Sequence, residues 1–117
     1  MKRRVRFISL LVLASALVSG CSTRSERERI LKHDLITMRM AIDNYTLEKQ
    51  AAAQSLQALV NGHYLKEIPT DPFTQKKDWA LQFDTVVLSP EQSSTGIVDV
   101  HSASVHVASD GSTYNEW

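Results

Sequence analysis

The side chain best suited to chemistry in this sequence is the thiol of Cys21, the one cysteine among 117 residues. It follows two small residues, Ser19 and Gly20, and an apolar run at residues 5–18 that is too short to span a bilayer. Four basic residues lie before or at the start of this run, as in a secretory signal: Lys2, Arg3, Arg4 and Arg6. In such a lipobox the small residues admit a peptidase, and the cysteine takes a diacylglyceryl thioether before cleavage between Gly20 and Cys21. The sequence therefore predicts a lipoprotein signal peptide at residues 1–20.

Two other interpretations of this segment stay open, an ordinary cleaved signal with an unused cysteine and an uncleaved membrane anchor. If Cys21 is lipidated, the anchoring is strong, because each buried methylene contributes about 0.8 kcal/mol and bacterial lipoproteins carry several acyl chains. We therefore expect residues 21–24 to be a lipidated tether in the cell envelope, with the remaining domain facing the periplasm. Ser22 favours the outer membrane over the inner one, because many enteric lipoproteins kept at the inner membrane have aspartate there.

Charge and motif content exclude several function classes. Loss of the signal peptide leaves nine basic residues against 13 acidic ones, a net charge of −4. A mildly acidic domain is poorly suited to nucleic acid, because that binding depends on phosphate neutralisation. The sequence has no glycine-flanked nucleophilic serine and no glycine-rich phosphate loop. We therefore expect no nucleic-acid partner, no small-molecule substrate and no enzymatic activity.

An amphipathic helix is predicted over residues 25–50. Thr23 or Ser25 could cap it, with Glu26 or Glu28 as the acidic partner of a capping box. Apolar residues recur there at the alternating spacing of four and three that places them on one stripe: Leu31, Leu35, Met38, Ile42 and Tyr45. The stripe could pack on the chain's own sheet or contact a partner protein, and two heptads are few for a stable coiled coil. We expect packing within the domain, and we also take the stripe and the sheet edges as candidate contact surfaces.

The second half of the chain changes character. A short helix is predicted at residues 55–61, capped by Ser55 and ended by Gly62, and two prolines at residues 68–73 exclude helix there. Residues 78–117 then show the alternation and short apolar runs of strands. The expected architecture is α+β, with a long amphipathic helix and a short helix packed on a small antiparallel sheet.

Within that sheet, the spacing predicts a strand pair at residues 96–102 and 105–109, joined by a tight turn at residues 102–104. The core candidates of this pair are Ile97 or Val98, Val100, Val105 and Val107. Such a hairpin could also bring Asp99, His101 and His106 together as a two-histidine, one-carboxylate metal site. Alternation instead places both histidines on the exposed face, and we favour that interpretation.

Several sequence blocks occur in the order seen in one protein family: IDNYTLEK at residues 42–49, SLQALV at 55–60, GHYL at 62–65, IPTDPF at 68–73, GIVDVHS at 96–102, ASDG at 108–111 and a final EW. Together they resemble the major pseudopilin of the type II secretion system, from about residue 35 to residue 117. The resemblance implies a pilin-like domain over residues 25–117. It also implies a non-enzymatic role in protein interactions, as an accessory component of a type II secretion or type IV pilus-like machine. The lipobox replaces the family's prepilin site and apolar helix, so we expect no pseudopilin-like filament.

The resemblance further implies a calcium site in the loop before Trp117. Calcium takes six to eight oxygen ligands. This loop offers Asp110, Ser112, Asn115 and Glu116, with Asp110 the best match to the family. A hydrogen-bonded Asp-Gly turn without an ion is the favoured alternative. Two other functions also stay open: an envelope-anchored ligand- or metal-binding module, and a structural lipoprotein unrelated to secretion.

Overall fold

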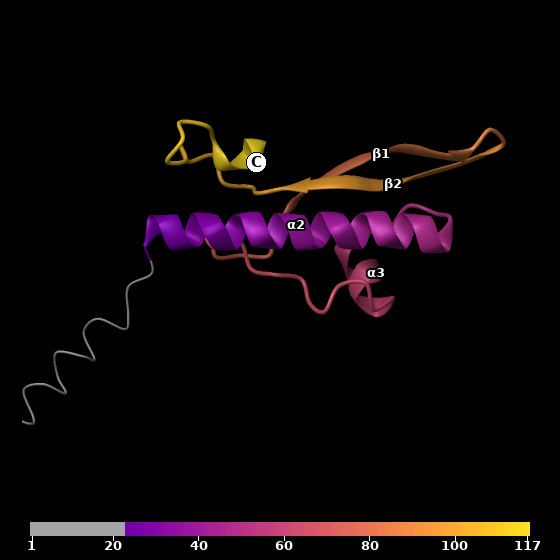
Figure 1. Cartoon of the computed structure of the whole chain (residues 1–117), viewed down its shortest axis with the longest axis horizontal. Helices are drawn as coiled ribbons and strands as arrows, with labels where there is room; N and C mark the ends of the chain where they lie inside the picture. The colour runs from indigo at the N-terminus through magenta and orange to yellow at the C-terminus, as the bar shows by residue number, and fades with distance from the viewer. Residues whose placement is uncertain (1–22) are drawn as a thin grey trace, which may run out of the picture.

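The computed structural model of the chain describes residues 23–117 and shows an α+β arrangement (Figure 1). Its elements are a long helix, a short helix, a two-stranded antiparallel sheet and a 3-10 turn: α2 (Arg24–Lys49), α3 (Leu56–Asn61), β1 (Ala80–Ser89), β2 (Gln92–His101) and η1 (Tyr114–Glu116). The predictions for the signal peptide and the lipidation site fall outside the described residues.

Helix α2 begins and ends at residues suited to those positions. Thr23 is its N-cap, and the Thr23 hydroxyl accepts a hydrogen bond from the backbone N–H of Glu26 at 3.1 Å. Gln50 ends the helix in a left-handed conformation, with φ of 51°. The predicted helix at residues 25–50 is therefore confirmed, with each bound shifted by one residue, and the cap is Thr23 rather than Ser25.

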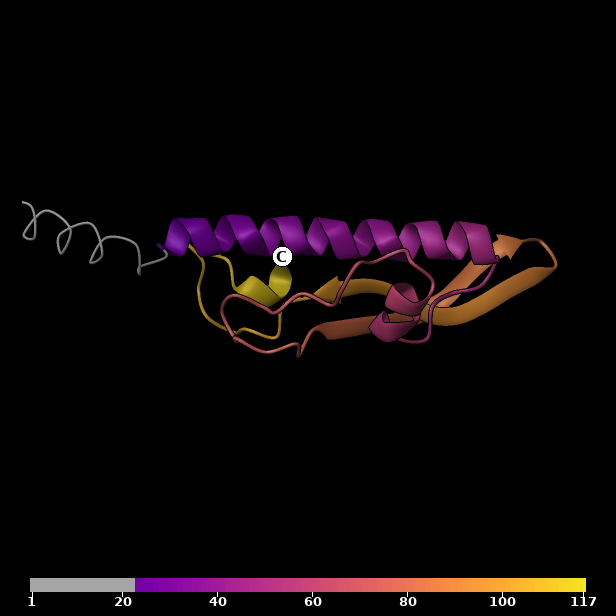
Figure 2. The same ribbon diagram turned by 90° about the horizontal axis from the view of Figure 1, so that it is seen from below.

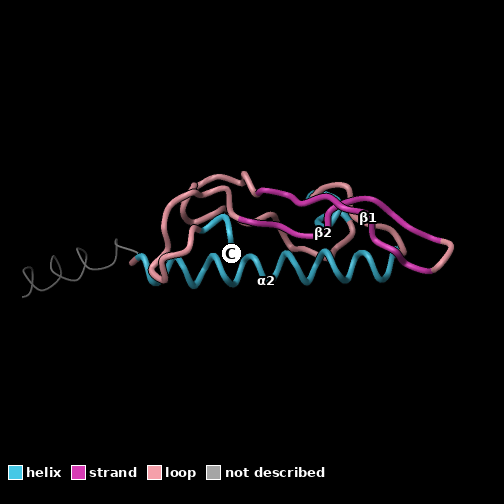
Figure 3. The backbone as a smooth tube through the Cα atoms, turned by 90° about the horizontal axis from the view of Figure 1, so that it is seen from above, coloured by secondary structure: helices cyan, strands magenta, loops and turns pink. Residues whose placement is uncertain are grey.

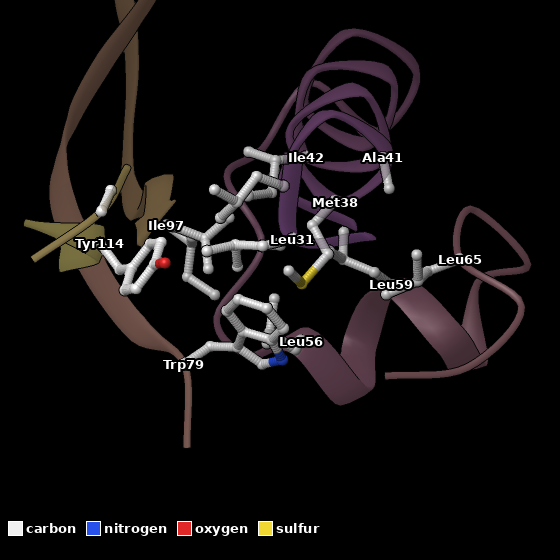
Figure 4. Close-up of a cluster of buried hydrophobic side chains, with 14 residues drawn as sticks. Leu31, Met38, Ala41, Ile42, Leu56, Leu59, Leu65, Trp79, Ile97 and Tyr114 are labelled. Carbon is white, nitrogen blue, oxygen red and sulfur yellow. The ribbon is translucent and has the colours of Figure 1, made fainter. Parts of the chain in front are cut away.

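The predicted apolar stripe of α2 forms the core of the domain (Figure 4). Its first four members are buried, and Tyr45 packs at the edge of the core with its ring 5.3 Å from that of Tyr64. The side chains that cover the stripe come from α3, β2, η1 and the loops: Leu56, Leu59, Leu65, Trp79, Ile97, Val100 and Tyr114. Packing within the domain is therefore confirmed. The interpretation of Leu31, Leu35, Met38 and Ile42 as a contact surface is wrong, because no partner can reach side chains that are at most 2% exposed.

The short helix α3 follows its predicted bounds closely. Ser55 caps it by accepting a hydrogen bond from the N–H of Ala58 at 3.1 Å, and Gly62 follows its last residue. Leu56 and Leu59 turn inward and are buried. Residues 69–79 then form an ordered loop, in which the indole N–H of Trp79 donates to the carbonyl oxygen of Pro69 at 2.7 Å.

The sheet differs from its prediction. Strands β1 and β2 form one hairpin whose turn lies at Pro90 and Glu91, and Ser89 pairs with Gln92 beside it. The predicted strand at residues 105–109 does not form, apart from one isolated bridge between Val107 and Thr113. Among the core candidates, Ile97 and Val100 are fully buried, but Val105 and Val107 are 71% and 56% exposed.

The buried carboxylate of Asp71 explains why residues 102–104 are no surface turn. Asp71 is fully buried and accepts hydrogen bonds from the N–H of Phe73 at 2.8 Å and from the hydroxyl of Ser102 at 2.5 Å. The Ser102 hydroxyl in turn accepts from the N–H of Ser104, which is also buried. A buried polar group needs such partners. The Asp71 carboxylate therefore holds the segment after β2 inside the domain.

All other described elements lie on one side of α2, which leaves the opposite side of the helix uncovered (Figure 2). The β1–β2 hairpin runs along the helix, and its turn projects past the C-terminal end of α2 (Figure 3). Gly96 of β2 is the point of closest approach to the segment after α2. A Cβ atom at Gly96 would lie 2.5 Å from the carbonyl oxygen of Ala53 and 2.7 Å from the Ala52 Cβ.

We expect Gly96→Ala to destabilise the domain by about 1–3 kcal/mol, because the added methyl overpacks a contact made with backbone. Urea unfolding followed by circular dichroism measures the change. Ser93→Ala is the matched control, since Ser93 is exposed on the same strand. Equal stability of the two variants would contradict the close packing of Gly96 on residues 52–53.

Candidate functional site

The predicted lipidation site lies directly before the described domain. Gly20 and Cys21 fall outside the described residues, and Ser22 alone separates Cys21 from the cap residue Thr23. None of the helices within residues 23–117 has the length and apolarity needed to cross a membrane. Any lipid on Cys21 would therefore sit very close to the first turn of α2.

The loop proposed to bind calcium folds as an Asp-Gly turn. The Asp110 carboxylate accepts from the backbone N–H of Ser112 at 2.9 Å and from the Ser112 hydroxyl at 2.5 Å, and these bonds lower the pKa of Asp110. Gly111 occupies the turn with φ of +88°. The Ser112 oxygen also accepts from the indole N–H of Trp117 at 2.7 Å, whereas Glu116 is exposed in η1. Calcium binding by Asp110, Ser112 and Glu116 stays a prediction.

The geometry does not support the alternative of a metal site at the hairpin, and of the two histidines that we expected on the exposed face, His106 is exposed and His101 is half-buried. His101 ends β2, and its Nδ1 donates to the carbonyl oxygen of Trp117 at 2.7 Å while its Nε2 lies 3.3 Å from Asp99. His106 is exposed in the loop beyond β2, because the predicted second strand does not form. Within the part of the chain that the structure describes, no three His, Cys, Asp or Glu side chains cluster closely enough to hold a metal ion.

Arg39, in the middle of α2, joins three segments of the chain. Its guanidinium donates to the Asp99 carboxylate at 2.8 Å, to the carbonyl oxygen of Val100 at 2.9 Å and to that of Trp117 at 2.7 Å. Burial alone would raise the pKa of Asp99, but the hydrogen bonds from the Val100 backbone and from Arg39 outweigh it and lower the pKa. Arg39 therefore fixes the end of β2 and the residue Trp117 against the helix.

A second polar cluster lies around Glu28, closer than Arg39 to the N-terminal end of α2. The Glu28 carboxylate accepts from the Ser109 hydroxyl at 2.6 Å, the Ser109 N–H at 2.8 Å and the Tyr114 hydroxyl at 2.8 Å. These bonds, those of Ser109 above all, lower the pKa of Glu28. Arg24 completes the cluster, with its Nε 3.5 Å from Glu28 and 3.2 Å from the Tyr114 hydroxyl. Glu28 was a candidate capping-box partner, and the structure instead assigns it to holding the loop before η1.

Exposed apolar side chains lie elsewhere on the domain, and the sequence analysis missed them. Ile36, Met40 and Leu47 are 57%, 60% and 67% exposed, and at 3.6 residues per turn they lie on the side of α2 opposite its buried stripe, which we call the outer face. Their spacing of four and seven places them on one line of the helix, so a search for a second stripe would have found them. Phe83 and Val87 of β1 are also exposed, at 54% and 75%.

A hollow of about 330 Å³ lies beside the outer face, between α2 and the segment that ends at Trp117. Ile36, Leu35, Lys32, Arg39, Asp110 and Trp117 line it. The Lys32 ammonium lies 4.8 Å from the centre of the Trp117 ring, a cation–π contact. The hollow thus combines apolar side chains with three charged groups: Arg39 is paired with Asp99, Lys32 lies over the Trp117 ring, and Asp110 accepts hydrogen bonds from Ser112.

No protein-family model matches the chain, and no curated protein or solved structure matches it either. What the domain presents to its surroundings is the outer face of α2 and the exposed residues of the hairpin.

We expect the Glu28 cluster to make stability depend on pH. The folded-state pKa of Glu28 is below the unfolded value of about 4.3, so its contribution is complete above that pH and is lost as the pH falls through the folded pKa. The Glu28→Gln substitution should therefore lower the free energy of unfolding at pH 7. The difference in unfolding free energy between the variant and the parent should shrink below about pH 4.

Urea unfolding between pH 3 and pH 7 measures both effects. Glu26→Gln is the matched control, because Glu26 is exposed in the same first turns of α2 and its ion pair with Arg29, at 3.7 Å, lies on the surface. If the Glu28→Gln deficit were constant across this pH range, the ionised carboxylate would not be the stabilising species.

Proposed function

We propose that this chain is a non-enzymatic lipoprotein of the cell envelope, anchored through Cys21, with a pseudopilin-like domain at residues 25–117. Its role is protein interaction, as an accessory component of a type II secretion or type IV pilus-like machine. The domain faces the periplasm, with the outer membrane favoured over the inner.

The observation that carries the proposal is the position of the lipobox relative to α2. The N-cap Thr23 follows Cys21 by two residues, and the helix it starts runs for 26 residues with every other element on one side. A pseudopilin domain is likewise built on a long N-terminal helix that leads to the membrane. In this chain a lipid would take the place of the family's apolar segment.

The outer face supports the role in protein interactions. Single exposed apolar residues need no explanation, but Ile36, Met40 and Leu47 form a line along a helix that is covered on its other side. Interface centres favour such exposed apolar anchors. The proposed occupant of this line is an apolar helix face of another envelope component. A structural lipoprotein unrelated to secretion is the second possibility, and the partner's identity distinguishes the two.

Cys21→Ser should abolish lipid modification and release the chain from the membrane fraction, or leave it there only as the uncleaved precursor. Fractionation followed by mass measurement distinguishes these products. A mature-length Cys21→Ser product that still fractionates with membranes would contradict the anchoring through Cys21.

Replacing Ile36 and Met40 by lysine should weaken the association with the partner at least about fivefold, since loss of an apolar anchor costs more than about 1 kcal/mol. The measurement is crosslinking in native membranes, purification of the chain and quantification of co-purified secretion or pilus proteins. Val105→Lys is the control, because Val105 is similarly exposed but lies in the loop after β2. Equal recovery from all variants would exclude the outer face as the contact surface.

A further inference from the structure

The outer edge of β1 is an unpaired strand edge within the described residues. β1 pairs with β2 alone, whereas the other edge of β2 is covered by the segment after α2. There the N–H of Ile97 donates to the carbonyl oxygen of Ala53 at 2.8 Å, and the Gln54 amide donates to the carbonyl oxygen of Thr95 at 2.7 Å. The hairpin also projects past α2, so the helix does not cover its far end (Figure 3).

These contacts determine which backbone groups of β1 face outward. Ile97 directs its N–H away from β1, so Ile97 and its partner Phe83 are a non-hydrogen-bonded pair. The register is regular from Phe83 to Val87, so Thr85 and Val87 are also in non-hydrogen-bonded pairs with their partners on β2. The short distance of 2.9 Å between the hydroxyls of Thr85 and Thr95 agrees with this. Phe83, Thr85 and Val87 therefore direct their N–H and C=O groups toward the free edge.

We propose that β1 pairs antiparallel with β1 of a second copy of this chain, with a two-fold axis at Thr85. Such a pair places Phe83 opposite Val87 of the other copy, and Thr85 opposite Thr85. An aromatic residue opposite a β-branched residue, and threonine opposite threonine, are both favourable cross-strand pairs. The pairing would bury Phe83 and Val87, which are 54% and 75% exposed.

The strand itself selects this register. Thr85 is the centre of residues 83–87, the stretch in which β1 pairs without a register shift, so an axis at Thr85 places this regular stretch against its own copy. An axis at Asp84 would place two carboxylates opposite each other, and the backbone groups of Asp84 already face β2. With the axis at Thr85, Asp84 lies opposite Val86 instead.

The edge has few of the residues that prevent strand pairing, and the two register shifts of the hairpin flank residues 83–87 rather than interrupt them. β1 contains no lysine and no proline, and its one charged residue is Asp84. The Asp84 carboxylate accepts from the N–H of Thr85 at 2.7 Å, and pairing would exchange this bond for one with the second copy. A single strand edge buries less than the roughly 800 Å² per partner typical of stable complexes, so the pairing should depend on protein concentration.

This inference does not depend on the proposed function, although confinement to a membrane would raise the local concentration and favour pairing. The test is disulfide crosslinking of full-length Thr85→Cys under mild oxidation in isolated membranes, with the parent chain as background. In the proposed register the two residues at position 85 face each other, within the Cα separation of about 4.4–6.8 Å that a disulfide allows. The expected result is a disulfide-linked homodimer.

Val87→Cys is the register control. Two residues at position 87 would be offset by four residues along the strands, about 13 Å, which is too far for a disulfide. Linkage at position 85 but not 87 supports the proposal. Equal linkage at both positions, no linkage at position 85, or linkage of position 85 to a different protein would overturn it.

A second pair of variants tests the apolar contact. In the Thr85→Cys chain, adding Val87→Lys should reduce the linked dimer several-fold, whereas adding Val105→Lys should not, although both valines are more than 70% exposed. Equal reduction by both would overturn the assignment.

Thr85→Cys combined with Cys21→Ser separates this inference from the proposed function. At matched protein concentration, a disulfide-linked dimer of the double variant that is no longer in the membrane fraction supports strand pairing that is independent of lipid. If the Thr85→Cys chain is in the membrane fraction but forms no dimer, the strand pairing is overturned and the proposed anchoring is not.

Discussion

The fold depends on one constraint, that a single long helix must bury its apolar stripe against segments distant from it in sequence. An isolated helix is only marginally stable in water, and most helical stability in proteins comes from packing. The covering side chains come from residues 53–114, so most of the surface that the stripe packs against is distant from α2 in sequence. The hairpin, α3 and the final loop must therefore all be in place before the helix has a complete partner surface.

Two polar clusters on α2 fix how those segments sit on the stripe. Hydrophobic contact is non-directional, so it does not by itself determine the position of a loop along a helix. Glu28 receives the loop at Ser109 and Tyr114, and Arg39 receives the end of β2 and Trp117. These bonds are charge-assisted and geometrically specific. The apolar stripe thus provides the burial, and the two ionised side chains specify the register of the final 20 or so residues.

The local features of the sequence predicted the fold well, and the long-range ones did not. The caps Thr23 and Ser55 and the apolar stripe depend on neighbours within a few residues, so helix bounds could be derived from spacing. The hairpin was misplaced because Ser102 hydrogen-bonds to Asp71, 31 residues away, and turns a plausible surface turn into a buried corner. Glu28 was misassigned for the same reason, since a capping acid and a buried acceptor look alike until Ser109 is placed. Periodicity carries no information about such contacts.

The surfaces of the domain were harder to predict than its core for a related reason. A core stripe can be found from spacing because burial demands apolar residues along it, but exposed apolar residues satisfy no requirement of the fold. Ile36, Met40 and Leu47 could be polar without changing any described contact within α2's packed side, and the same holds for Val87 at the free edge of β1. The contacts within the described domain therefore do not explain why these positions are apolar. These exposed apolar positions are therefore the ones at which the proposed contacts with other proteins can be tested.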